Sequence, residues 1–123
     1  MAYARASEAA LPPRELEAAV LLKAATRLQA ISDDWEGRKP DLDGALTYNR
    51  KLWTILVSAV THPENPIPGE IRQSIVDLGM FTFNRTLSVL ADPAPGKLAV
   101  LVNINREIAA GLRAQPGPAA RAA

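Results

Sequence analysis

Few side chains in this 123-residue chain could carry out chemistry. The chain has no cysteine, which excludes a disulfide, a thiolate metal site and a cysteine nucleophile. Its one histidine, His62, directly precedes Pro63, and we expect it to close a helix rather than to act as a ligand or base. No group of His, Asp and Glu residues has metal-ligand spacing, and no glycine-rich segment suits a phosphate. The sequence therefore predicts a protein that is not an enzyme and needs no cofactor or metal.

Three Asn-Arg dipeptides are better candidates for a functional role, namely Asn49-Arg50, Asn84-Arg85 and Asn105-Arg106. On a helical wheel, Asn49 and Asn105 fall in the middle of apolar stripes, whereas Asn84 falls on a polar face. A buried amide is costly unless its hydrogen bonds are made. Two hypotheses remain open: the two amides form a polar pair that fixes helix register, or they line a groove that holds another chain.

Aromatic side chains supply further candidates. Phe81 lies on the polar side of its helical wheel, where either the N-terminal arm with Tyr3, the proline-rich joints or a partner protein could cover it. Trp53 lies on an apolar stripe and is expected in the core. Trp35 falls in a run of mixed charge, and we expect it to cover one end of the molecule.

The elements that must position these residues are marked by the prolines. The ten prolines fall between segments of helical periodicity, and none lies inside one. The pattern predicts four helices, at residues 13–32, 42–61, 68–91 and 95–112, with Asp41 as the N-cap of the second. No segment alternates as a strand does, so we expect an all-α fold, a small antiparallel bundle in one domain at 1–113. Residues 114–123 are predicted to be a disordered tail.

The third predicted helix is apolar on two faces. One face carries Ile71, Ile75 and Leu78, and the other carries Val76, Met80, Phe83, Leu87 and Leu90. Such a pattern is typical of a helix that packs on two sides. Gly79 is expected to allow the close approach of another helix.

Charge and hydropathy narrow the function further. Fourteen basic and 13 acidic residues give a net charge of +1, which is too balanced for a protein that binds nucleic acid mainly through phosphates. No apolar run approaches the roughly 18 residues that span a bilayer, so no membrane contact is expected. Residues 1–10 lack the apolar region of a signal peptide, and the predicted compartment is the cytoplasm.

Four segments together resemble the FlaF family of flagellar biosynthesis regulators from alphaproteobacteria. The segments are Pro13-Arg14-Glu15-Leu16-Glu17, Ala45-Leu46-Thr47-Tyr48-Asn49-Arg50-Lys51-Leu52-Trp53, Leu78-Gly79-Met80-Phe81 and Leu101-Val102-Asn103-Ile104-Asn105-Arg106-Glu107-Ile108-Ala109-Ala110-Gly111-Leu112. They occur in the family's order and cover residues from about 3 to 112. The family usually has Ser or Thr before the first Pro-Arg-Glu, where this chain has Pro12.

The resemblance implies a cytoplasmic protein that binds flagellin and supports its synthesis, secretion and filament assembly as a chaperone-like factor. It implies flagellin's terminal helical segments as the partner, with FlbT as a possible second one. The alternative is post-transcriptional control of flagellin mRNA, directly or with FlbT. The candidate partner-binding residues are Tyr48, Asn49, Arg50, Trp53, Phe81, Asn105 and Arg106.

Overall fold

The computed structural model describes residues 13–114, and this part of the chain is helical apart from short joints, without a strand. Its elements are α2 (Pro13–Asp33), α3 (Trp35–Arg38), η1 (Lys39–Asp41), α4 (Leu42–Thr61), α5 (Gly69–Ala91), η2 (Pro95–Leu98) and α6 (Ala99–Ala114). The predicted all-α fold with four long helices is therefore confirmed, and the proline-marked boundaries hold to within a few residues. The predicted tail lies outside the described residues after Ala114, as does Tyr3.

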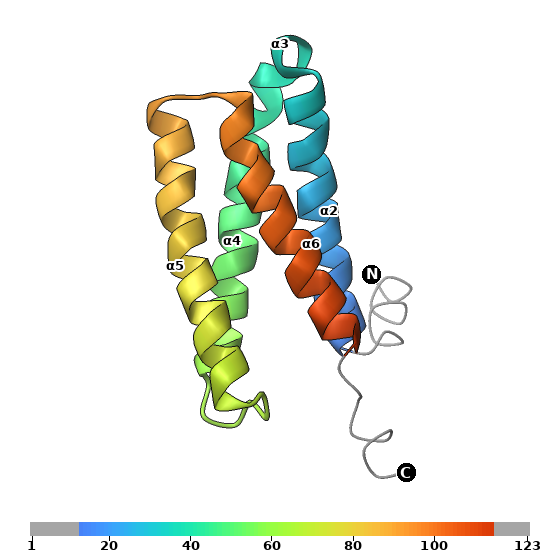
Figure 1. Ribbon diagram of the computed structural model, residues 1–123, viewed down its shortest axis with the longest axis vertical. Coiled ribbons are helices and arrows are strands. Elements are labelled where there is room, and N and C mark those ends of the chain that lie inside the picture. The colour runs from blue at the N-terminus through green and yellow to red at the C-terminus, as the bar shows by residue number, and fades with distance from the viewer. Residues whose placement is uncertain (1–12, 115–123) are drawn as a thin grey trace, which may run out of the picture.

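Helices α2 and α4 lie side by side, with α6 packed on α2 and α5 packed on α4 (Figure 1). The most extensive packing is between α2 and α6, followed by the pair α4 and α5. Helices α5 and α6 are joined at one end and diverge toward the other, where α6 ends beside the start of α2 (Figure 1). As a result, α5 packs mainly on α4 and leaves much of its circumference without a neighbouring helix.

The joints between α4 and α5 and between α5 and α6 are held by basic side chains that donate hydrogen bonds to backbone carbonyls. Between α4 and α5, Arg72 donates from Nε to the carbonyl of Val60 (2.6 Å) and from Nη2 to those of Asn65 (3.0 Å) and Ile67 (3.1 Å). Such bonds satisfy the acceptors that a helix leaves unpaired at its C-terminus.

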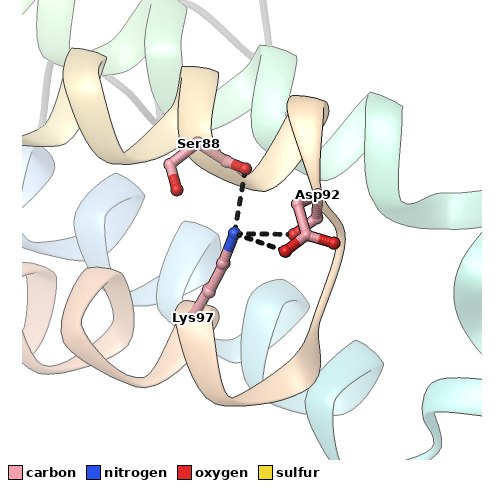
Figure 2. A network of polar contacts seen from close by, with 3 residues as sticks. All are labelled: Ser88, Asp92 and Lys97. Carbon is pink, nitrogen blue, oxygen red and sulfur yellow. Dashed lines mark hydrogen bonds and ion pairs between the residues drawn. The ribbon is translucent and has the colours of Figure 1, made fainter.

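The joint between α5 and α6 is closed in the same way. Lys97 Nζ donates to the carbonyls of Ser88 (3.2 Å) and Asp92 (2.8 Å) and lies 3.5 Å from the Asp92 carboxylate, as Figure 2 shows. A cation at the end of α5 also interacts favourably with the helix dipole.

The first joint is more ordered than the sequence predicts. Residues 35–41 form the short helices α3 and η1, and Trp35 is partly buried against the end of the core that contains Leu46. Its position agrees with the expected cover for one end of the molecule. Asp41 occupies the N-cap position of α4, but its backbone is already helical and its side chain makes no capping hydrogen bond. The prediction of a side-chain cap at Asp41 is therefore wrong, because η1 runs directly into α4 and leaves no extended residue there.

The inward face of α5 differs from the prediction. The buried residues of α5 are Ile75, Gly79, Thr82, Thr86 and Val89. The second apolar face is only partly covered: Val76 and Phe83 are partly buried against the core, whereas Met80, Leu87 and Leu90 are 55%, 64% and 50% exposed. The expectation that α5 packs on two sides is thus wrong for these three residues, because within residues 13–114 α5 packs mainly on α4.

Small inward residues explain this orientation of α5. A Cβ placed on Gly79 would lie 2.5 Å from Val57 Cγ2 and 3.5 Å from Trp53 Cε3, both on α4. A Cβ this close would force Val57 to shift, so the predicted role of Gly79 in allowing the close approach of another helix is confirmed. Short side chains along the same face let the backbones of α4 and α5 approach each other.

Candidate functional site

A buried polar network connects three of the sequence-predicted site residues. The Trp53 indole Nε1 donates to Asn105 Oδ1 (2.8 Å), and Asn105 Nδ2 donates to Asn49 Oδ1 (2.7 Å) and, at 3.4 Å, to the carbonyl of Leu21. All three side chains are fully buried or nearly so. The network therefore ties α4 and α6 to each other and to α2.

This geometry answers the question that the sequence left open for the two amides. Asn49 and Asn105 face the interior, as predicted, and they bond to each other. In this structure neither they nor Trp53 lie on a groove wall, so the structure supports the polar pair that fixes helix register. Asn49 Nδ2 has no hydrogen-bond partner among residues 13–114, so within this range the network is not fully satisfied.

The surface feature that stands out is the exposed apolar face of α5. We call it the α5 stripe and define it as Val76, Met80, Phe83, Leu87 and Leu90, of which Met80, Leu87 and Leu90 are exposed while Val76 and Phe83 are partly buried against the core. Its members are spaced by four, three, four and three residues, the repeat with which one helix contacts another. It extends over about 21 Å at 1.5 Å per residue. Sequence periodicity found these residues as the second apolar face of a helix that packs on two sides.

The α5 stripe borders α4. Arg72, one helical turn before Val76 on the same side of α5, reaches the carbonyl at the end of α4. Gly79 contacts Val57, and on α4 the residues one and two turns before Val57, Thr54 and Arg50, are exposed. The α5 stripe is therefore flanked on α4 by a polar residue, Thr54, and a basic one, Arg50.

The opposite side of α5 contains the other aromatic candidate. Phe81 is 40% exposed, and the Arg85 guanidinium lies 5.5 Å from the centre of its ring. Arg85 thus covers part of the ring from within α5. Asn84 is exposed, as the wheel predicted. Phe81 is not part of the α5 stripe.

The remaining predicted residues do not form one site. Arg50 and Arg106 are both exposed, on α4 and α6 respectively. Tyr48 is half-buried between α2 and α4, with Lys23 Nζ 5.7 Å and Arg27 Cζ 5.1 Å from the centre of its ring. Of the seven, only Arg50 lies on the part of α4 that borders the α5 stripe.

Three further properties of residues 13–114 bear on metal binding, on titration and on membrane contact. Within residues 13–114, no three His, Asp or Glu side chains gather as metal ligands would. Burial raises the pKa of the Glu17 carboxyl, an effect that the charge of Arg14 opposes. None of the helices between residues 13 and 114 is long and apolar enough to cross a membrane.

A comparison with protein families gives the biological context. The family model for the flagellar protein FlaF matches residues 1–112. The chain belongs to the FlaF family. Comparison with curated proteins and with solved structures gives no match. FlaF membership confirms the resemblance found in the sequence, indicates a flagellar role, and places the chain in a family of regulatory or structural proteins rather than known enzymes.

Proposed function

We propose that the protein binds flagellin one to one and supports its synthesis, secretion and filament assembly as a chaperone-like factor. FlaF family membership supports a flagellar role. The observation that carries the binding step is the exposed α5 stripe, with its helix-contact spacing and its three half-exposed apolar side chains. Its proposed guest is a terminal helical segment of flagellin.

The proposed contact follows the way in which an amphipathic helix is bound. A guest helix would place its own apolar residues between those of the α5 stripe. Exposed Arg50 on the neighbouring α4 could then pair with a carboxylate or a free carbonyl of the guest. Since the stripe residues that contact the guest are already exposed, binding would need no opening of the core.

The exposed side chains of the α5 stripe supply only part of the binding free energy. Met80, Leu87 and Leu90 are about half exposed, so covering them contributes on the order of 1 kcal/mol each. Association costs at least about 4 kcal/mol, which exceeds the sum of these three contributions. Micromolar binding therefore also needs the apolar face of the guest helix and the polar border on α4. A contact made of several such modest contributions can still release flagellin. Release is what export requires of a chaperone that keeps an assembly helix covered in the cytoplasm.

The test is titration calorimetry of the protein with purified monomeric flagellin at two salt concentrations. We expect micromolar binding that changes little with salt. Leu87→Glu places a charge at the most exposed residue of the α5 stripe and should weaken binding at least tenfold. Ser88→Glu is the matched control, because residue 88 is exposed on the same turn but lies off the stripe. Terminal truncations of flagellin then locate the bound segment.

Two results would overturn the proposal. One is the absence of flagellin binding at concentrations up to about 100 μM. The other is equal loss of binding in Leu87→Glu and Ser88→Glu, which would move the contact away from the stripe. Binding of flagellin mRNA, with an affinity that falls steeply with salt, would instead support the post-transcriptional role.

A further inference from the structure

A second apolar surface lies between α2 and α4, on a different side of α4 from Val57. We call it the α2–α4 groove, and it encloses about 540 Å³. Leu16 and Val20 line it from α2, and Tyr48, Lys51, Leu52 and Ile55 line it from α4. Ile55 is 68% exposed, more than any residue of the α5 stripe. An isoleucine this exposed in the wall of a groove indicates a surface that a partner covers.

One end of the α2–α4 groove is basic. Lys23 and Arg27 lie within 6 Å of the Tyr48 ring, and Lys51 lines the groove beside them. None of these three cations forms an ion pair with another residue of the described range 13–114. The acidic residue of the groove wall, Glu17, comes from the part of α2 that precedes this basic end by more than one turn.

We propose that the α2–α4 groove is a docking site for an acidic amphipathic helix of a partner protein. The apolar face of that helix covers Leu16, Val20 and Ile55, and its carboxylates pair with Lys23, Arg27 and Lys51. Charge complementarity identifies the occupant, because three unpaired cations at one end of an apolar groove favour a ligand that is both apolar and anionic. The site is independent of the proposed flagellin contact on α5.

The surroundings of Tyr48 favour a protein partner over nucleic acid. Single-stranded nucleic acid is held by aromatic rings on which bases stack. The Tyr48 ring already has two cations against it, at 5.1 and 5.7 Å, and the rest of the groove is largely aliphatic. A base would find no free ring there, whereas a helix with leucine side chains would find a complementary surface.

The experiment uses two synthetic helical peptides of about 14 residues with the same leucine face. One peptide carries glutamate on its polar face and the other carries lysine. Chemical-shift mapping on the full-length protein should show that only the glutamate peptide binds, with the largest shifts at Tyr48, Leu52 and Ile55. Ile55→Glu should abolish binding, and Lys51→Glu should weaken it about tenfold. Thr54→Glu, an exposed neighbour on another face of α4, introduces the same single negative charge as Ile55→Glu and should bind normally.

Several outcomes would overturn this site. These are no binding of the glutamate peptide at millimolar concentration, equal binding of the lysine peptide, or a loss in Thr54→Glu as large as in Lys51→Glu. Shifts of the groove residues by a single-stranded RNA rather than by the glutamate peptide would assign the groove to nucleic acid. The Leu87→Glu variant should bind the glutamate peptide normally, so failure at the groove and failure of flagellin binding on α5 are distinguishable.

Discussion

Replacing Asn105 with alanine tests whether the buried polar network holds the helices together. The change leaves Trp53 Nε1 without an acceptor and Asn49 Oδ1 without a donor, both in buried side chains. A buried polar group that loses its partner costs about 1–3 kcal/mol. Two such groups predict a loss of about 2–6 kcal/mol in the free energy of unfolding. A domain of this size has roughly 5–15 kcal/mol in total, so the loss would be large.

Replacing Asn49 instead should cost much less, although both amides are equally buried. Asn49 takes part in one hydrogen bond of the network, and its Nδ2 has no partner. Asn49→Ala therefore removes an unsatisfied donor together with the acceptor, while Asn105 keeps its contacts with Trp53 and the Leu21 carbonyl. One lost hydrogen bond corresponds to about 1 kcal/mol. The structure thus predicts an asymmetry that the sequence, which treats the two asparagines alike, does not.

Urea unfolding followed by circular dichroism measures both losses. The double variant should lose little more than Asn105→Ala alone, because the groups that the single change leaves unpaired at position 49 are then absent. Equal costs for the two single variants, or a greater cost for Asn49→Ala, would refute the hydrogen-bond assignment. Strict additivity in the double variant would show that the two amides do not interact.

Three further predictions concern the joints and the packing. Gly79→Ala should be less stable than Gly111→Ala by about 1–3 kcal/mol in thermal unfolding, since a Cβ at 79 meets Val57 whereas one at 111 has nothing within 4 Å. Equal stability of the two variants would contradict this. Arg72→Ala should cost about 1.5–3 kcal/mol in urea unfolding, because the backbone acceptors of its joint lose a charged donor. Glu17→Gln should raise the melting temperature at pH 7, where the half-buried carboxylate of Glu17 is charged, and the gain should vanish below about pH 4, where that carboxyl is protonated. A gain that persists at low pH would show another cause.

The sequence was sufficient to predict the helices and the buried amides. Proline placement located the joints because proline is excluded from a helix interior, and this rule does not depend on tertiary contacts. Asn49 and Asn105 were predicted inside because each lies in the middle of a strong apolar stripe. The roles of their bonds could not be predicted, since hydrogen-bond partners come from helices distant in sequence.

The sequence was not sufficient to predict the site. A helical wheel shows which faces are apolar but not how many neighbours a helix has. The prediction that both faces of α5 are covered failed because α6 diverges from α5 after η2. The α2–α4 groove was missed for a related reason: Tyr48 and Ile55 meet Leu16 and Val20 only once the two helices are placed side by side.

The orientation of α5 connects its packing to the proposed binding. Facing α4 with Gly79, Thr82 and Thr86 is not the arrangement that buries the most apolar surface. Thr86 Oγ1 must donate to the carbonyl of Thr82 within the helix (2.7 Å), and Thr82 Oγ1 has no hydrogen-bond partner. With the α5 stripe inward, Met80 and Leu87 would be covered, and their burial would add on the order of 1 kcal/mol each to folding. The face with Gly79, Thr82 and Thr86 is the one that packs on α4, because it permits contacts as close as that between Gly79 and Val57. The larger apolar residues of the α5 stripe therefore remain on the outer side. Because Met80, Leu87 and Leu90 are not covered in the folded protein, a partner helix that covers them would gain the free energy of their burial.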